Sequence, residues 1–367
     1  MLVVGVAELA QEVLHAPPGT YLAGAANRRI LPVLPGNSVL TLDGEPHRQR
    51  RRALAPMFHG ERLMAMAPVI RELSRREVER WPLGRPFAVL PRMRSLALSI
   101  AVGLILGIED SACVEQVERH LRGALRPYSM LSGIGVLARL GPLSPQAAAD
   151  RGHRAFALGL DKAVRWAREH SGHQASAPEL LGSNEVFALL LAAHETTATA
   201  LAWAIELLSW APDAADAVAG ELPRSQRPSL DAVIWESLRF RPPLVDIVRQ
   251  ANAPVRLAGR SVPPGTLLLI PPPLIHREAT GDEGDRFDMV RFRGNRPDPH
   301  SWLPFGGGER RCLGAPLAML ELREVLPQVI ERFELLPTGS APERPRLHGT
   351  ALVPANGARV VLRPRSK

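Results

Sequence analysis

The spacing of hydrophobic residues predicts helices over most of the first two thirds of the chain. Apolar side chains recur at mixed intervals of three and four residues, which is the period of an α-helix with one buried face. The segments with this pattern are 45–57, 62–81, 92–107, 112–126 and 150–170. Strand patterns are limited to 255–257, 266–270 and 358–362, beside turns rich in Pro and Gly. We therefore expect a mainly α protein with small β-sheets.

Two further helices carry unusual polar residues. The first is predicted from about residue 185 to 210, with Ser183 or Asn184 as N-cap and Pro212 as its stop. The second begins near Ser229 and ends at Pro242. A polar stretch at 281–308 with isolated aromatic residues predicts a long ordered loop, and such loops are usually functional. No repeat or linker divides the chain, so we expect a single domain over 1–367.

Composition narrows the class of protein. The chain has 367 residues, of which 46% are hydrophobic and 22% charged, which disfavours a disordered or collagen-like chain. The longest charge-free apolar segment, 95–108, is shorter than the roughly 20 residues that span a bilayer, and the N-terminus lacks the basic region of a signal peptide. Cys113 and Cys312 form neither a CxxC pair nor a disulfide framework. A cytoplasmic protein with reduced thiols and no membrane span is expected.

The positive charge is almost entirely arginine. The net charge is +8, and 43 of the 45 basic residues are Arg, because Lys occurs only at Lys162 and Lys367. The densest run, 48–52, is compatible with a nucleic-acid patch, a solvated helix face or an anion site. An acidic protein partner would fit the net charge equally well.

The helix over 185–210 contains the sequence His194-Glu195-Thr196-Thr197 within an apolar environment. Burying an acid and hydroxyl groups is costly unless they are hydrogen-bonded or used. A zinc-protease helix would need a second His at position 198, which is Ala, so that site is excluded. Two interpretations remain: a proton relay built from adjacent carboxylate and hydroxyl groups, and a structural polar kink.

Glu236 and Arg239 lie three residues apart on the helix that begins near Ser229, so they share a face. An exposed pair of this kind contributes little to stability. Here the neighbours include Trp235, Leu238 and Phe240. A buried structural pair is therefore as plausible as a surface pair.

The most unusual segment is 305–314, Phe-Gly-Gly-Gly-Glu-Arg-Arg-Cys-Leu-Gly, followed by a helix from about Ala315. It lacks the Gly-Lys-Ser/Thr of a phosphate-binding loop and no βαβ pattern surrounds it. Cys312 stands beside a helix N-terminus with Arg310 and Arg311 just before it, an environment that lowers the pKa of a thiol. A thiolate is either a nucleophile, which needs a His partner, or a metal ligand, and both readings stay open on this evidence.

The chain resembles the cytochromes P450, which are haem-thiolate proteins. Phe305, Gly308, Arg310, Cys312 and Gly314 match every defined position of the family's Phe-x-x-Gly-x-Arg-x-Cys-x-Gly loop. The Glu-x-x-Arg helix of the family is matched by Glu236 and Arg239, and Arg291 falls where a third member of that ion network is usual. The resemblance covers nearly the whole chain, without the usual N-terminal segment and with compressed stretches around the oxygen-activation helix. It implies the cytochrome P450 fold.

The resemblance also assigns roles to individual residues. Cys312 looks like the iron ligand, and Glu195 and Thr196 look like the acid and alcohol of the oxygen-activation helix, where Ala193 replaces a commoner glycine. The residues similar to those that hold haem in the family are His47, Arg51, Arg249, Phe305, Gly308, Arg310 and Gly314. Those that resemble a substrate pocket are Leu189, Ala192, Ala193, Leu244, Val245, Asp246, Ile247, Val248 and Leu352. Asp246 either caps local backbone or contacts a basic or hydroxylated substrate.

The resemblance implies a monooxygenase with haem b that inserts one oxygen atom of O2 into a small, largely apolar molecule, as in secondary metabolism. Electrons would come from a separate ferredoxin-type donor, because no flavin or iron–sulfur motif is present. Arg50, Arg52, Arg311 and Arg323 are expected to form a positive docking face on a monomer. The alternatives are a haem-thiolate enzyme of altered chemistry (peroxygenase, oxidative coupling or rearrangement) and a noncatalytic haem-binding module.

Overall fold

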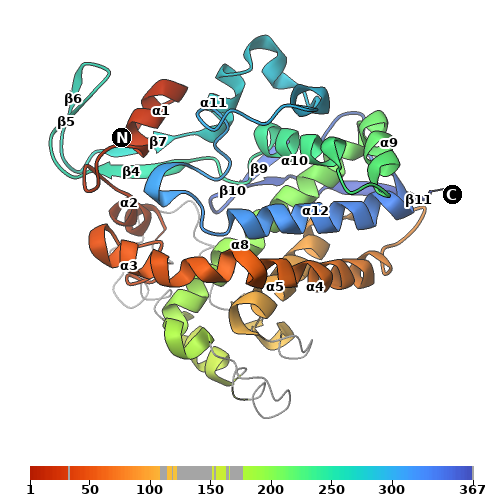
Figure 1. Cartoon of the computed structure of the whole chain (residues 1–367), viewed down its shortest axis with the longest axis horizontal. Coiled ribbons are helices and arrows are strands. Elements are labelled where there is room, and N and C mark those ends of the chain that lie inside the picture. Colours follow the sequence, from red (N-terminus) through yellow and green to blue (C-terminus); the bar gives the residue numbers. More distant parts are fainter. Residues whose placement is uncertain are drawn as a thin grey trace.

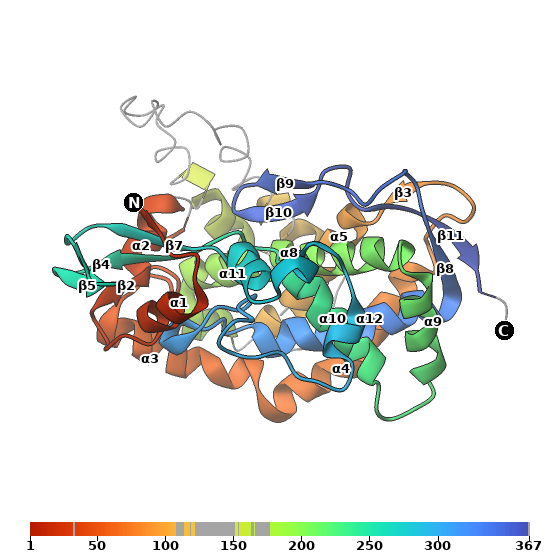
Figure 2. The ribbon, with the colours of Figure 1, turned by 90° about the horizontal axis from the view of Figure 1, so that it is seen from above.

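The computed structural model describes residues 1–31, 34–107, 114–117, 119–121, 151–152, 154–162, 165 and 177–365. The long helix α8 (Ala177–Ser209) runs through the molecule and is surrounded by other elements in both views (Figures 1 and 2). Its backbone departs from helical geometry at Gly182, where φ is 69°. The regular helix that follows Gly182 begins where the predicted caps Ser183 and Asn184 stand.

Helices α4, α5, α9, α10 and α12 pack with α8 around one hydrophobic core. Their bounds are Gly60–Val78 for α4, Leu90–Leu106 for α5, Pro212–Glu221 for α9, Pro228–Phe240 for α10 and Ala315–Arg332 for α12. α5 is apolar on nearly all sides, as expected of a helix buried in a core. It ends at Gly107, which adopts the left-handed conformation with φ of 68°. Trp203 on α8 is fully buried in this interior.

The described residues also contain four smaller α-helices and four short 3-10 helices. The α-helices are α1 (Ala7–Leu14), α2 (Ala23–Ile30), α3 (Gly44–Leu54) and α11 (Pro272–Glu278). The 3-10 helices are η1 (Ala55–Phe58), η4 (Gly281–Asp285), η5 (Met289–Phe292) and η6 (Gly308–Arg310), with a further turn after α2. Together with the intervening loops, η4 to η6 make up most of the polar stretch predicted at 281–308.

The strands form small sheets at the edges of the helical body (Figure 2). One sheet has the order β1-β7-β4-β2, from Leu2–Val3, Leu267–Ile270, Ile247–Ala251 and Tyr21–Leu22; β1 is parallel to β7 and the other pairs are antiparallel. A second has the order β3-β11-β8, from Phe87–Ala88, Arg359–Pro364 and Phe333–Pro337. The pairs β5 (Val255–Leu257) with β6 (Arg260–Val262) and β9 (Pro345–His348) with β10 (Ala351–Pro354) are hairpins. The prediction of a mainly α protein with small sheets is confirmed.

The predicted elements match the observed ones closely where the structure describes them. The helices predicted at 45–57, 62–81 and 92–107 correspond to α3 with η1, to α4 and to α5. The strands predicted at 255–257 and 266–270 are β5 and β7, and the one at 358–362 lies within β11. The helices predicted at 112–126 and 150–170 lie partly outside the described residues, and their described parts are helical.

One described helical segment, Leu181–Ser209, is long and apolar enough to cross a membrane by those two criteria. It belongs to α8, and 67% of its most apolar window is buried inside the protein. The segment Leu181–Ser209 is therefore a core helix of this fold.

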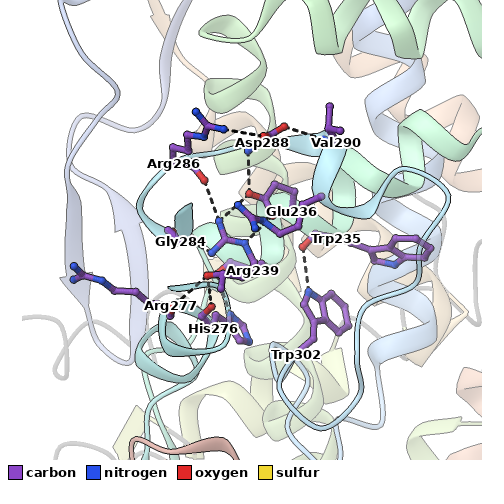
Figure 3. A network of polar contacts seen from close by, with 12 residues as sticks. Trp235, Glu236, Arg239, His276, Arg277, Gly284, Arg286, Asp288, Val290 and Trp302 are labelled. Atoms are coloured by element: carbon purple, nitrogen blue, oxygen red, sulfur yellow. Dashed lines mark hydrogen bonds and ion pairs between the residues drawn. The ribbon is translucent and has the colours of Figure 1, made fainter. Parts of the chain in front are cut away.

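A buried ion pair links α10 to the loop that follows α11 (Figure 3). Arg239 donates to both carboxylate oxygens of Glu236 at 2.7 and 2.8 Å, and the Glu236 side chain is fully buried. Arg239 also donates to the carbonyls of Gly284 and Arg286, and the Asp288 N–H donates to Glu236 at 2.9 Å. Arg291 lies 3.6 Å from the same carboxylate. The surface alternative for this pair is therefore excluded, and the three predicted members of the ion network meet.

We expect Glu236→Gln to lower the free energy of unfolding by about 3–5 kcal/mol, because it leaves the Arg239 charge buried without its carboxylate. Glu324→Gln is the control, since it breaks the more exposed pair of Glu324 with Arg71 and should cost less than about 1 kcal/mol. Urea unfolding of both variants measures the difference. Equal losses in the two variants would contradict a special role for the buried pair.

Candidate functional site

The loop that carries Cys312 is a tight turn held by its own backbone. The Cys312 N–H donates to the Phe305 carbonyl at 2.8 Å. Gly306 and Gly308 both have positive φ, 66° and 65°, which side-chain-bearing residues rarely adopt. A Cβ on Gly308 would stand 1.9 Å from the carbonyl oxygen of Leu14 at the end of α1. The loop therefore packs backbone against backbone, which only glycine allows at this position.

The polar surroundings of the Cys312 thiol match the predicted ones, but the predicted direction of its pKa is wrong. The backbone N–H groups of Gly314 and Ala315 and the charges of Arg51 and Arg311 all act to lower the pKa. Burial acts in the opposite direction and is the largest effect, so the pKa of the free thiol is raised. The residue nevertheless retains accessible surface.

His276 on α11 connects the buried Glu236–Arg239 ion pair to the chain that leads into the cysteine loop. His276 Nδ1 lies 2.9 Å from the carbonyl of Arg239, and the Leu303 N–H donates to Nε2 at 2.8 Å. Nδ1 must therefore carry the proton, and burial lowers the pKa of this imidazole to about 4. Trp302 Nε1 makes a parallel contact by donating to the Trp235 carbonyl at 3.1 Å (Figure 3). The residues just before Phe305 are thus tied to α10.

The polar residues of α8 are placed by two different contacts. Thr196 Oγ1 donates to the Ala192 carbonyl one turn earlier at 2.7 Å, which is the back-bonding expected of a mid-helix threonine. Ala192 itself is exposed, although most of the helix around it is buried. Glu195 accepts two hydrogen bonds from Arg94 on α5, at 2.8 and 2.5 Å. The carboxylate and the hydroxyl are therefore both positioned, and an accessible strip of α8 lies beside them.

Four basic residues predicted to bind one ligand come from three separate elements. His47 and Arg51 lie on α3, Arg249 lies on β4 and Arg310 lies in the cysteine loop. Arg51 donates to the Arg311 carbonyl at 2.7 Å, and Arg249 donates to the Val248 carbonyl at 2.8 Å. Arg310 instead pairs with Asp43 at 2.8 Å and donates to the carbonyls of Val39 and Leu42.

This basic group contains buried polar atoms without a matching anion. Arg249 is only 6% exposed, and burial together with the nearby Arg310 charge lowers its pKa to about 10. His47 is 1% exposed, its Nδ1 has no hydrogen-bond partner, and burial lowers its pKa to about 4. Within the described part of the chain, neither Arg51 nor Arg249 forms an ion pair. Because unpaired buried charges are costly, these residues suit an anionic ligand.

The residues predicted to line a substrate pocket differ in burial. Leu189 and Val248 are packed in hydrophobic clusters. The others keep accessible surface: Ala192, Ala193, Leu244, Val245, Asp246, Ile247 and Leu352. Ile247 Cδ1 lies 3.7 Å from the position of a Cβ on Gly306, so this segment borders the cysteine loop. Leu244 forms a bridge with Ala351, and the Leu352 N–H donates to the Pro243 carbonyl.

Two of the four arginines predicted for a docking face are already paired. Arg50 lies 2.7 Å from Glu185, and Arg323 lies 2.8 Å from Asp231. Arg52 and Arg311 are exposed. The positive charge available on this face is therefore smaller than the sequence suggests.

Comparison with known proteins identifies the family. A sequence model described as Cytochrome P450 matches residues 167–361. The Mycobacterium tuberculosis cytochrome P450 137 is 34% identical over 99% of this chain and 80% of its own length, and cytochrome P450 135B1 of the same organism is 32% identical over 96% and 79%. The chain is a cytochrome P450. The expected family and fold are thereby confirmed.

Solved structures agree with this result. The crystal structure of CYP175A1 from Thermus thermophilus matches with a TM-score of 0.80 and 26% identity, over 99% of this chain and 89% of that one. A cyanobacterial P450 with bound retinoic acid, CYP120A1, matches with a TM-score of 0.82 and 22% identity, over 99% and 89%. The similarity to CYP120A1, at 22% identity, shows a shared fold only.

Membership of the family makes this P450 a haem-thiolate monooxygenase with haem b as cofactor, O2 as co-substrate, a small-molecule substrate and a redox partner. When bound, haem b supplies the iron centre at which O2 is used to oxidise the substrate. The residues present fit this group, because the Cys312 thiol receives two backbone N–H donors while Arg249 and His47 lack an anionic partner. Among the described residues, no group of three or more His, Cys, Asp or Glu side chains offers a separate metal site.

Sequence reasoning did not find Arg94 or His276. Arg94 is 101 positions away from Glu195 in the chain, and His276 bridges segments separated by 37 and 27 positions. For Arg94, the signal was a pair of arginines, Arg92 and Arg94, in the first turns of an otherwise apolar helix. The sequence contains no comparable signal for His276.

Gly308→Ala should destabilise this P450 more than Gly349→Ala. Both glycines have φ near +60°, so both substitutions carry a backbone cost of about 1–2 kcal/mol. Only at Gly308 would the new methyl group collide with another backbone atom, whereas Gly349 has open space around it. Free energies of unfolding and haem content of the two variants measure the difference. Identical behaviour would show that the close approach to Leu14 is unimportant.

Proposed function

We propose that this P450 inserts one oxygen atom of O2 into a small, largely apolar organic substrate with electrons from a separate ferredoxin-type donor. The observation that carries this proposal is the positioned acid and alcohol pair, Glu195 and Thr196, on the accessible strip of α8. We assign Cys312 as the thiolate ligand of the haem iron. As that ligand, the Cys312 thiolate would supply electron density to the haem iron, which is the property that suits thiolate-bound haem to O2 chemistry.

In this proposal Glu195 and Thr196 deliver protons. The Thr196 hydroxyl is held by the Ala192 carbonyl, and it can offer an oxygen lone pair to water on the accessible side of the helix. Glu195 is oriented by Arg94 through two charge-assisted hydrogen bonds. Each carboxylate oxygen of Glu195 accepts one of these bonds and keeps a second lone pair that can take a proton. Arg94 would thus act as a positioning residue that fixes the direction in which the acid presents its free lone pairs.

The basic group would hold the two haem propionates. We assign His47, Arg51 and Arg249 as their main partners, because His47 Nδ1 is buried without a partner, and Arg249, which is buried, and Arg51, which is part-buried, have carbonyl partners alone. Arg310 pairs with Asp43, so it can bind a propionate only with the N–H donors that this ion pair leaves free. Phe305, Gly308 and Gly314 would shape the loop under the iron. Charge-assisted bonds of this kind are the strong ones in a dry site.

We further propose a single domain over 1–367, a cytoplasmic monomer and a role in secondary metabolism. The exposed Arg52 and Arg311 near Cys312 support docking of an acidic electron donor. The substrate would lie between α8 and the segment 244–248, near Leu352.

Asp246 favours one class of substrate. Within the described part of the chain its carboxyl group has no hydrogen-bond partner, which argues against the local capping role. Its side chain keeps accessible surface, and burial among apolar neighbours raises its pKa. A cationic group on an otherwise apolar substrate would compensate the free-energy penalty of desolvating this carboxylate.

Cys312→Ala tests the assignment of the iron ligand. The reduced wild-type protein should give the carbon monoxide band characteristic of thiolate-bound haem, and the variant should not. Cys113→Ala is the control and should leave the band unchanged. Survival of the band in Cys312→Ala would refute the assignment.

Spectral titration tests the role of Asp246. We expect decyltrimethylammonium to shift the haem spin state at about tenfold lower concentration than 1-decanol, a difference of about 1.4 kcal/mol. Asp246→Asn should abolish this preference and leave the affinity for 1-decanol unchanged. A preference that persists in the variant would show that the cation is selected elsewhere.

A further inference from the structure

The segment 34–43, before α3, connects α8 to the cysteine loop. The backbone of Val39 is bonded on both sides: its N–H donates to both carboxylate oxygens of Glu185 on α8, at 3.1 Å each, and its carbonyl accepts from Arg310 at 3.3 Å. Ser38 and Thr41 are fully buried and bonded to each other and to the Pro35 carbonyl. This segment is therefore a rigid bridge between two parts of the proposed haem site.

Glu185 is the anchor of this bridge on α8. Its side chain is fully buried, and it also pairs with Arg50 on α3 at 2.7 Å. Burial raises the pKa of this carboxyl group, while the Val39 N–H and Arg50 act against the rise. A buried carboxylate is retained only where such partners compensate its desolvation. Glu185 thus joins α8 to the bridge and to α3 at once.

Arg50 links Glu185 to the residues assigned to haem binding. Arg50 stands between His47 and Arg51 on α3, and both of these are assigned to the propionates. Asp43 extends the same network, since it pairs with Arg310 and accepts from the backbone N–H groups of Gly24 and Ala25 at 2.7 Å each. Glu185 and Asp43 neutralise Arg50 and Arg310. Among Arg50, Arg51, Arg249 and Arg310, the described residues offer no carboxylate partner only to Arg51 and Arg249, and haem b carries two propionates.

We propose that Glu185 is a positioning residue for the cofactor: it holds Val39 and α3 in the arrangement in which His47 and Arg51 reach the haem propionates. This inference rests on the propionate-binding roles in the proposed function. Glu185 itself needs no contact with haem. Its effect on haem binding is transmitted through the backbone of Val39 and through the ion pair with Arg50.

The test compares Glu185 with a second buried carboxyl group on the same helix. Glu206 is 1% exposed, accepts from the Glu343 N–H at 2.9 Å and from Trp210, and also has a raised pKa because of burial. It is therefore matched to Glu185 in burial and in accepting a backbone N–H, while its partners lie outside the proposed haem site and include no arginine within ion-pair distance among the described residues. The variants are Glu185→Leu, Glu185→Gln, Glu206→Leu and Glu206→Gln.

Two measurements are made on each holoprotein: the rate of haem transfer to excess apomyoglobin, and hydrogen exchange of the peptide that contains Val39. We expect Glu185→Leu to lose haem about tenfold faster than wild type, equivalent to about 1.4 kcal/mol, with faster exchange at Val39. Glu185→Gln should restore exchange at Val39 to near wild type, because its amide oxygen can still accept from the Val39 N–H. Its rate of haem loss should lie between those of wild type and Glu185→Leu, because the ion pair with Arg50 is lost. Both Glu206 variants should retain haem at the wild-type rate.

The proposal is overturned if Glu185→Leu and Glu206→Leu lose haem at the same rate, because haem loss would then follow general stability. Unchanged exchange at Val39 in Glu185→Leu would also overturn it. Failure of the proposed function has a different signature, namely a wild-type protein without the thiolate carbon monoxide band. In that event exchange at Val39, measured on the apoprotein, still decides whether Glu185 holds the bridge.

Discussion

The buried ion pair of Glu236 and Arg239 is the interaction on which the position of the cysteine loop depends. Its charges are compensated by backbone groups from the loop after α11 as well as by each other. The Arg239 carbonyl is bonded to His276, which in turn accepts from the Leu303 N–H. Two residues later Phe305 accepts from the Cys312 N–H. A pair that gains little energy by itself thereby defines where the thiol stands.

Electrostatics in the site follow from where carboxylates are placed and where they are absent. Glu185 pairs with Arg50, and Asp43 pairs with Arg310. Arg94 forms an ion pair with Glu195, the acid of α8. Arg51, Arg249 and His47 are left with only carbonyl partners or none. The same low-polarity surroundings raise the pKa of the free Cys312 thiol. A protein interior with unpaired cations and a neutral thiol is prepared for a ligand that brings two anionic groups and a metal ion.

The elements with strong local signals were predictable. α5 and α8 have long apolar patterns, and α10 and α12 begin at Pro-containing first turns. The two-residue strands β1, β2 and β3 have no such signal, because pairing with distant strands alone stabilises them. The predicted lowering of the Cys312 pKa failed for a related reason. Neighbours in sequence supplied the charges and N–H donors, whereas the burial that outweighs them comes from the packed fold.

The sequence by itself determined the chemistry of this protein: a cysteine in a glycine-rich turn, an acid beside an alcohol on an apolar helix, and a Glu-x-x-Arg pair. These signals are local, since turns, helix faces and i,i+3 pairs depend on neighbouring residues. Only the tertiary structure decided which arginines are paired. Arg94 meets Glu195 across 101 positions, Arg50 meets Glu185 across 135, and Arg310 meets Asp43 across 267. Charge pairing depends on distance in space, so only the fold shows that Arg310 is paired while Arg51 and Arg249, named with it by the family resemblance, have carbonyl partners alone.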